Sequence, residues 1–378
     1  MAGGRMVVIP GGAHPRRCHP PGQPVFLLNR GTVCAPRALY PRCQPEIAPT
    51  CRRGSQAMIS IRALLALGTA LGGTAASAKE FTSSDIYAAD YPTVMAVAHL
   101  DSLIRERTQG RHSIRRLGAS DLDSENLTVR EVRSGKLDLA RVNLAVFHRT
   151  VPSTVVPSLP FLFRSAAHMK RVLDGPIGDE ILADLDSEGV IGLCFYDTGF
   201  RSYAATRPIR TVGDMKGLKV RAQAADTWAI MLRAMGAEPV VMPISRISAS
   251  LKAGVIDAVE GTLSTDAASR IFDVAKFFSL TEHSMAPGVL VFSKQVWDEL
   301  SREDQAIIRA AAKESVPYMR GVWDGYQISA RVLIEKSGGQ IIDDVDRASF
   351  ADVLLPLYPR LVPSPQLQDL VKRIKSMD

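Results

Sequence analysis

Short apolar runs alternate with longer amphipathic runs from residue 79 almost to the end of the chain, and this order restricts the possible folds most. Apolar runs of about four to eight residues are typical of buried strands, whereas an apolar residue at every third or fourth position is typical of a helix. The clearest apolar runs are residues 190–197, 255–261 and 288–293. Strands that alternate with helices predict an α/β fold. We expect two α/β lobes, with the chain crossing between them more than once.

One helical pattern is much longer than the others and covers residues 301–337. Ser301 is a suitable N-cap, because its hydroxyl can accept a hydrogen bond from a backbone N–H of the first turn. Gly338 and Gly339 are a stop signal at the other end. Pro317 lies inside the pattern, and we expect it to kink the helix.

The first 57 residues differ from the rest of the chain in composition. They are rich in Pro, Gly and Arg, and they contain four of the five cysteines, namely Cys18, Cys34, Cys43 and Cys51. These cysteines form no C-x2-C pair, which argues against a zinc site. We interpret residues 1–57 as a disordered upstream extension that arises from a wrong choice of start codon. The alternative is a genuine cysteine-bearing N-terminal tail.

Residues 58–78 have the features of a secretory signal peptide. Met58 is a suitable start, Arg62 supplies a positive charge, and an apolar core rich in Ala and Leu leads to an A-x-A cleavage site that ends at Ala78. As an internal segment, this core is too short to span a bilayer, which needs about 20 apolar residues. We therefore expect cleavage after Ala78 and a periplasmic protein that begins at Lys79.

The net charge of +7 comes from this leader rather than from the remaining chain. Residues 1–57 hold eight arginines and one glutamate, and Arg62 adds one more positive charge. The chain from Lys79 therefore has 37 basic and 38 acidic residues, which gives a net charge of −1. Proteins that bind nucleic acids or anionic membranes usually carry a strong positive charge, so we expect neither partner.

Sequence patterns of common enzyme classes are missing after residue 79. There is no G-x-S-x-G, H-E-x-x-H or P-loop pattern, and no G-x-G-x-x-G follows a strand. The five histidines of this region form no pair at helical i, i+4 spacing. Cys194 lies in an apolar run, where a buried thiol is more common than a nucleophile. We expect no enzyme and no bound cofactor or metal, and one cysteine allows no disulfide within the chain.

Two arginines stand near the ends of the segment 197–223. Pro208 interrupts regular structure between Arg201 and Arg221, and a short apolar strand ends directly before Arg221. Ligands of open α/β sheets bind outside the carboxyl ends of the strands. A guanidinium group at such a place offers paired donors that match a carboxylate. The pattern therefore indicates a carboxylate site, although two surface charges without a ligand would give the same spacing.

The same segment resembles the signature of the DctP-type substrate-binding proteins of TRAP transporters, which are periplasmic receptors for organic acids. Further segments resemble this family in the same order, namely YAADYPTVMAVAHLDSLIRERTQGR (87–111), LPFLFR (159–164), GVIDAVEG (254–261) and SLTEHSMAPGVLVFSK (279–294). The resemblance extends from about Tyr87 to about Val362. It implies a two-lobed periplasmic-binding-protein fold, with a cleft between the lobes and a long helix that bridges them.

The resemblance also implies the extent of the lobes and the partners. It assigns residues 79–198 and about 288–320 to lobe 1, and residues 199–287 and about 321–378 to lobe 2. The pattern 301–337 is then the bridging helix. Receptors of this kind close on a ligand by hinge motion. We expect a monomer that delivers an organic acid to the TRAP membrane permease subunits, which use an ion gradient rather than ATP. A ligand-sensing module for a two-component system is the alternative.

The resemblance assigns roles to several polar residues. In the family, the arginine that matches Arg221 clamps the substrate carboxylate, and the one that matches Arg201, in a "GFR" turn, assists it. Glu260 matches a family glutamate and is either a hydroxyl acceptor, a partner of an arginine or part of a structural ion pair. Asp90 matches a loop that reaches the far end of the ligand. Arg141 interrupts an apolar strand, and because a buried arginine needs a partner, it is a candidate for the cleft wall.

The stretch MPISRIS, residues 242–248, departs from the family pattern. Ile244 replaces an aromatic residue, Arg246 replaces an acid, and Ser248 replaces a tyrosine. Gly261 stands where the family has an asparagine. The loss of two rings should enlarge or flatten this wall of the pocket. Arg246 either adds a positive charge to the site or points to solvent.

The ADYPTV, GFRSY and SLTEHSMAP segments most resemble the branch of the family that binds hexuronates such as glucuronate and galacturonate. A uronate suits the candidate residues, because it offers one carboxylate to Arg221 and several hydroxyls to Asp90, Glu260 and Arg141. C4-dicarboxylates and other carboxylates are the alternative ligands. We expect His283 to be a structural histidine.

Overall fold

The structure is a computed structural model, and it describes residues 78–118, 124–196, 198–223 and 225–377. The predicted upstream extension, and all but the last residue of the predicted signal peptide, lie outside the described residues. Within the described part of the chain, no helix is both long and apolar enough to cross a membrane.

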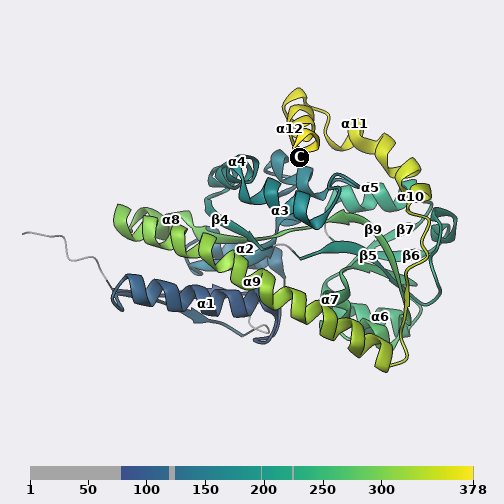
Figure 1. The fold of residues 1–378 in the computed structure, drawn as a ribbon, viewed down its shortest axis with the longest axis horizontal. Coiled ribbons are helices and arrows are strands. Elements are labelled where there is room, and N and C mark those ends of the chain that lie inside the picture. Colours follow the sequence, from purple (N-terminus) through teal and green to yellow (C-terminus); the bar gives the residue numbers. More distant parts are fainter. Residues whose placement is uncertain (1–77, 119–123, 197, 224, 378) are drawn as a thin grey trace, which may run out of the picture. The chain divides into compact units, whose positions relative to one another are not determined.

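Two β-sheets form the centre of the described part, with helices packed against them (Figure 1). The first sheet has five strands in the order β2-β1-β3-β10-β4. Its strands are β1 Lys79–Ser84, β2 His112–Arg116, β3 Leu139–Asn143, β4 Val190–Tyr196 and β10 Gly288–Ser293. β1 pairs in parallel with β2 and β3, whereas β10 pairs antiparallel with β3 and β4. A strand from late in the chain therefore lies inside this sheet.

The second sheet has six strands in the order β11-β9-β5-β8-β6-β7. Its strands are β5 Phe200–Ala205, β6 Lys219–Ala222, β7 Glu238–Val241, β8 Ala258–Gly261, β9 Phe277–Met285 and β11 Gln340–Ile342. β6 pairs in parallel with β7 and β8, and β5 pairs antiparallel with β8 and β9. The chain passes from the first sheet to the second between β4 and β5, and it returns between β9 and β10. This order confirms the predicted α/β fold class.

Helices pack against both sheets, and one of them reaches from one sheet to the other. The helices are α1 Pro92–Arg107, α2 Glu125–Arg133, α3 Ala166–Asp174, α4 Pro176–Asp184, α5 Asp226–Ala234, α6 Ile247–Lys252, α7 Leu263–Ala268, α8 Lys294–Asp298, α9 Arg302–Lys336, α10 Arg347–Leu354, α11 Tyr358–Leu361 and α12 Pro365–Ser376. α9 contacts α1 and β4 beside the first sheet and α7 and β11 beside the second (Figure 1). Ser301 is its N-cap as predicted, since its hydroxyl accepts a hydrogen bond from Asp304 N at 3.1 Å. Pro317 lies inside α9 without ending it.

Hydrophobic clusters cover both faces of each sheet, because the side chains of a strand point alternately to opposite faces. In β10, Val289 and Val291 belong to one cluster of the first sheet, whereas Leu290 and Phe292 belong to the cluster on its other face. In the second sheet, Ala205 and Ala258 pack towards α5 and α10, and Ala204 and Val259 pack towards α6. Cys194 in β4 is buried, as predicted.

Two features of the fold differ from the sequence interpretation. Residues 79–84 form β1, although the sequence indicated no strand there, because only Phe81 in this run is strongly apolar. Arg201 lies inside β5 rather than in a turn. The register of β5 shifts between Arg201 and Tyr203, so the strand is irregular at this arginine. Such bulges change the direction in which a side chain points.

Candidate functional site

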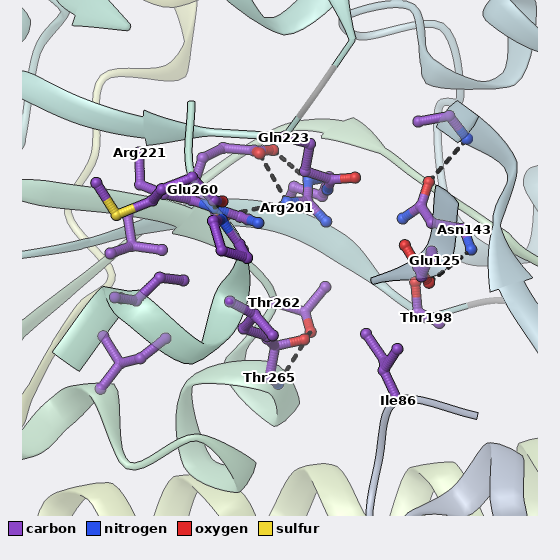
Figure 2. A pocket seen from close by; sticks show the side chains of 18 of the residues that line it. Ile86, Glu125, Asn143, Thr198, Arg201, Arg221, Gln223, Glu260, Thr262 and Thr265 are labelled. Atoms are coloured by element: carbon purple, nitrogen blue, oxygen red, sulfur yellow. Dashed lines mark hydrogen bonds and ion pairs between the residues drawn. The ribbon is translucent and has the colours of Figure 1, made fainter. Parts of the chain in front are cut away.

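A cavity of about 430 Å³ lies between segments of the two sheets (Figure 2). Its lining comes from parts of the chain that are far apart in sequence. From the side of the first sheet it includes Ile86, Tyr87, Glu125, Arg141 and Asn143, and from the side of the second sheet it includes Arg201, Arg221, Gln223, Glu260 and Thr262. The Tyr87 and Thr265 hydroxyls meet across the cavity at 3.3 Å. A volume of this size is typical of sites for small molecules.

Arg201 and Glu260 form a buried ion pair on the neighbouring strands β5 and β8. Arg201 donates to both carboxyl oxygens of Glu260, from Nε to Oε1 and from Nη2 to Oε2 at 2.6 Å. Nη2 also donates to the backbone oxygen of Glu260 at 3.0 Å. Burial alone would raise the pKa of Glu260, but Arg201 and His283 outweigh it and lower this pKa to about 2. The carboxyl is therefore ionised at neutral pH and fixes the Arg201 guanidinium.

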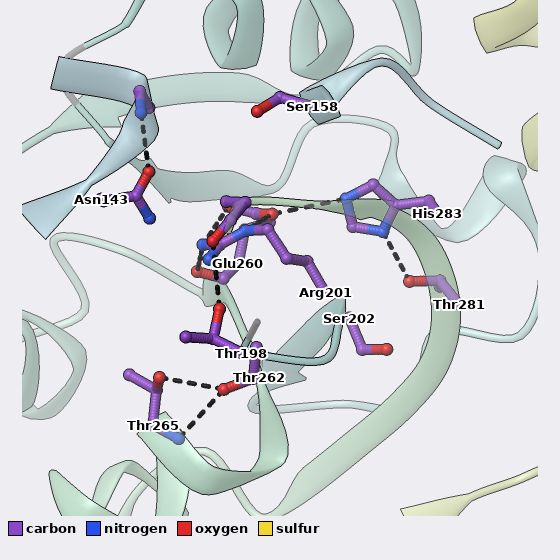
Figure 3. Close-up of polar contacts among 12 residues, drawn as sticks. Asn143, Ser158, Thr198, Arg201, Ser202, Glu260, Thr262, Thr265, Thr281 and His283 are labelled. Atoms are coloured by element: carbon purple, nitrogen blue, oxygen red, sulfur yellow. Dashed lines mark hydrogen bonds and ion pairs between the residues drawn. The ribbon is translucent and has the colours of Figure 1, made fainter. Parts of the chain in front are cut away.

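His283 continues this network behind Glu260 (Figure 3). Its Nε2 lies 3.6 Å from Glu260 Oε1, and its Nδ1 lies 2.8 Å from the Thr281 hydroxyl oxygen. The ring is fully buried and stacks on the Tyr203 ring at a centroid distance of 4.7 Å. His283 does not line the cavity, so it has the structural role that the sequence suggested, and it supports a residue of the site.

Arg221 lies in β6, near the carboxyl end of this strand, and lines the cavity. Its Nε donates a hydrogen bond to the Met242 backbone oxygen at 3.2 Å. Burial and the nearby Arg201 charge lower the pKa of Arg221, because both disfavour its positive charge. Among the described residues, no carboxylate forms an ion pair with Arg221. The amide oxygen of Gln223, in the orientation that satisfies both groups, accepts from Arg201 Nη2 at 2.8 Å and Nη1 at 3.1 Å.

Arg141 in β3 forms the opposite wall and is 3% exposed. Its Nη1 lies 3.5 Å from Glu125 Oε1 and 3.9 Å from Asp85 Oδ1. Its guanidinium carbon lies 5.4 Å from the centre of the Tyr87 ring. Burial raises the pKa of both acids, and Arg141 acts in the opposite direction. A Cβ atom at Gly288 would lie 2.6 Å from Arg141 Nε, so only glycine leaves space for this arginine.

The structure brings four of the six candidate residues together. Arg201, Arg221, Glu260 and Arg141 all line the cavity. Asp90 and Arg246 do not line it, and both side chains are exposed. In the loop with Asp90, the inward carboxylate belongs to Asp85, whose Oδ2 accepts from the Thr93 hydroxyl at 2.6 Å. The exposed Arg246 side chain agrees with the prediction that it points to solvent, and not with the prediction that it adds a charge to the site.

Several lining residues on the side of the first sheet were not among the predicted site residues. Glu125 lines the cavity and accepts a hydrogen bond from the backbone N–H of Asn143 at 2.8 Å. Asn143 is the last residue of β3, so the strand-end rule that indicated Arg221 would have found it too. Ser124 is the N-cap of α2, and Glu125 follows it directly. Within the described residues, no group of His, Cys, Asp and Glu side chains could hold a metal ion.

Comparisons with known proteins agree with the architecture. Residues 83–363 match the family described as bacterial extracellular solute-binding protein, family 7, or DctP. A solute-binding protein of Chromohalobacter salexigens is 32% identical over 321 residues, which cover 83% of this chain and 95% of that protein. These relatives are solute-binding proteins rather than enzymes.

Solved structures of TRAP periplasmic solute-binding proteins are also similar. One, from Xanthobacter autotrophicus Py2 with bound β-D-galacturonate, is 44% identical with a TM-score of 0.77, and the match covers 79% of this chain and 100% of that chain. Another, from Pseudomonas putida F1 with bound D-glucuronate, is 29% identical with a TM-score of 0.77, and covers 79% and 98%.

The family match includes every residue that lines the cavity, since these fall between Ile86 and Phe278. The similar structures extend the agreement to both sheets and to the helices around them. The family resemblance and the two-lobed fold that it implied are thereby confirmed. The chain belongs to the DctP family of bacterial extracellular solute-binding proteins.

Proposed function

We propose that this protein is the solute receptor of a TRAP transporter and that it binds a hexuronate by holding the ligand carboxylate on Arg221. The observation that carries this proposal is the balance of charges in the cavity. Arg201 is paired with Glu260, and Arg141 lies between Glu125 and Asp85. Arg221 is the cavity arginine left without an acidic partner among the described residues, and it would bind one carboxylate.

A single available arginine favours a monocarboxylate over a C4-dicarboxylate. A second carboxylate in the cavity would lose its water without a matching cation, which is unfavourable. The neutral and acidic groups of the lining, among them Glu125, Asn143 and Gln223, suit hydroxyl groups instead. The galacturonate and glucuronate in the similar structures support the same ligand class.

Isothermal titration calorimetry on the protein from Lys79 to Asp378 tests this proposal. We expect binding of galacturonate or glucuronate, and weaker or no binding of succinate and malate. A charge-assisted hydrogen-bonded pair contributes about 1.5–3 kcal/mol, so Arg221→Ala should weaken binding at least about ten-fold. Arg246→Ala removes an exposed arginine outside the cavity and is the matched control, which should bind as the native protein does. Unchanged affinity in Arg221→Ala, or a preference for dicarboxylates, would contradict the proposal.

We further propose that the protein is secreted, acts as a monomer and delivers its ligand to the membrane permease of the transporter. Closure of the two sheets and their helices over the cavity would occur by hinge motion. Mass spectrometry of the secreted protein should give a chain that begins at Lys79, and light scattering should give the mass of one chain. A mature protein that keeps residues before Lys79 would refute the predicted cleavage site.

A further inference from the structure

The cavity does not end at the arginines but continues into the hydrophobic cluster between the second sheet and α6. We call this part of the cavity the side compartment. Its lining includes Ala204, Ile244, Ile247, Val259, Ile271 and Phe278. Five of these residues belong to the buried part of that cluster, and Ile244 packs against it. Adjacent strands bring three of them to one face of the sheet, since Ala204 is the register partner of both Val259 and Phe278.

Arg221 lies at the entrance of the side compartment. Its Nε donates to the Met242 backbone oxygen, and Met242 also packs against the same hydrophobic cluster. A ligand whose carboxylate is held by Arg221 would therefore have one end beside this apolar space. Gly261 continues the Val259 face of β8, and a Cβ atom placed on it would meet no atom within 4 Å. The space is thus open on this side too.

The side compartment carries no positive charge. Of the described residues that line the cavity, the basic ones are Arg141, Arg201 and Arg221, and all three belong to its polar part. Asp266 lines the cavity with 2% of its surface exposed, and neither carboxyl oxygen has a hydrogen-bond partner among the described residues. Burial raises the pKa of Asp266 to about 8, so the group is largely uncharged at neutral pH.

Apart from the Asp266 carboxyl, such surroundings offer no hydrogen-bonding partner to a carboxylate or a hydroxyl of the ligand. A carboxylate would be desolvated without a cation, and a hydroxyl against aliphatic side chains would lose its hydrogen bonds to water. An apolar group, in contrast, is stabilised when it leaves water for these surfaces. An unsubstituted hexuronate carries hydroxyl groups around its ring, so it would fill the polar part of the cavity and leave the side compartment without a matching group.

We propose that the side compartment binds a small apolar substituent, and that the preferred ligand is a hexuronate that carries an O-alkyl group in addition to its free carboxylate. The inference rests on the proposed function, because it assumes that a hexuronate is held by Arg221. It adds a second specificity element to the carboxylate site. Burial of one methyl group of this kind increases affinity about four-fold.

Calorimetry with a set of O-methyl hexuronates tests the inference on the native protein, without any variant. Galacturonate and glucuronate are compared with derivatives that carry one O-methyl group at each hydroxyl in turn. We expect at least one derivative to bind about four-fold or more tightly than its parent. The methyl ester of galacturonate, which lacks the free carboxylate, should lose binding. If every O-methyl derivative binds more weakly than its parent, the inference is wrong.

The outcomes separate this inference from the proposed function. Absence of binding by both parent hexuronates would overturn the proposed function, whereas binding of the parents alone would overturn only the inference. Ile244→Phe should fill the side compartment and remove the advantage of the O-methyl derivative, measured as the ratio of its affinity to that of the parent. Val255→Phe adds the same ring at an exposed position outside the cavity and is the matched control. An O-methyl advantage that survives in Ile244→Phe would place the substituent elsewhere and contradict the inference.

Discussion

Replacing Glu260 with Gln tests whether the Arg201–Glu260 ion pair stabilises the fold. The pKa of Glu260 is about 2 in the folded protein, against an ordinary value of 4.5. One pKa unit corresponds to about 1.4 kcal/mol, so ionisation of this group stabilises the folded state by about 3 kcal/mol at neutral pH. The typical cost of removing one partner from a buried ion pair is similar, at about 3–5 kcal/mol. We therefore expect Glu260→Gln to lose about 3 kcal/mol of unfolding free energy.

The pH dependence of this loss follows from the lowered pKa. A carboxyl whose folded pKa is depressed contributes stability that is complete above its unfolded pKa and is lost as the pH falls towards its folded pKa. The difference between the native protein and Glu260→Gln should be constant above about pH 6. It should shrink to about 2 kcal/mol near pH 3.5 and decrease further towards pH 2.

Urea unfolding followed by circular dichroism between about pH 3.5 and 7.5 measures this difference. Glu314→Gln is the matched control, because the Glu314 side chain is 51% exposed and its ion pair with Arg107 lies at the surface. Surface ion pairs contribute about 0–1 kcal/mol, so the control should differ little from the native protein at any pH. A loss below about 1 kcal/mol for Glu260→Gln at neutral pH, or a loss that does not change with pH, would refute the reasoning.

Three further predictions concern other buried groups. The folded state raises the pKa of Asp266 to about 8 and keeps the group protonated, so the unfolding free energy of the native protein should fall as the pH rises from about 4 to 8. Asp266→Asn should therefore be more stable than the native protein near pH 8 but not near pH 4. Urea unfolding at the two pH values measures this difference. Burial raises the pKa of the Cys194 thiol, so a thiol reagent should label it only after unfolding, which absorbance of the released reagent group would follow. Burial also lowers the pKa of His148 to about 4, so its ring signals in NMR should titrate near this pH, and a midpoint near 6.5 would contradict its burial.

The sequence predicted the site best where one residue and its own strand were sufficient. Arg221 follows a short apolar strand, and the carboxyl ends of strands are where ligands bind in such folds. The partner of Arg201 could not be derived in this way, since Glu260 is 59 positions away and reaches Arg201 only because β5 and β8 are neighbours. The irregular register of β5 at Arg201 is likewise a property of the paired strands.

The loop before α1 shows why the residue type alone was not sufficient to predict which acid points inward. Two acids, Asp85 and Asp90, stand in this loop, and the family resemblance implied the cleft role for Asp90. The structure buries Asp85 beside Arg141 and leaves Asp90 exposed. Which of the two acids is buried depends on hydrogen bonds from the Thr93 hydroxyl and the backbone N–H of Tyr87, and both groups donate to Asp85. β1 was missed for a related reason, because its strand identity depends on pairing with β2 and β3 rather than on apolar residues of its own.

The position of β10 within the first sheet has a consequence for the order of folding. β3 and β4 have no direct pairing in this sheet, and residues 288–293 join them from both sides. Until the chain has been made as far as residue 293, β3 and β4 both present unpaired edges, which are prone to association with other chains. The sheet that contains the N-terminal strands can therefore be completed only after the second sheet has been largely synthesised. A fragment that ends before residue 288 should aggregate rather than fold as an independent half of the protein.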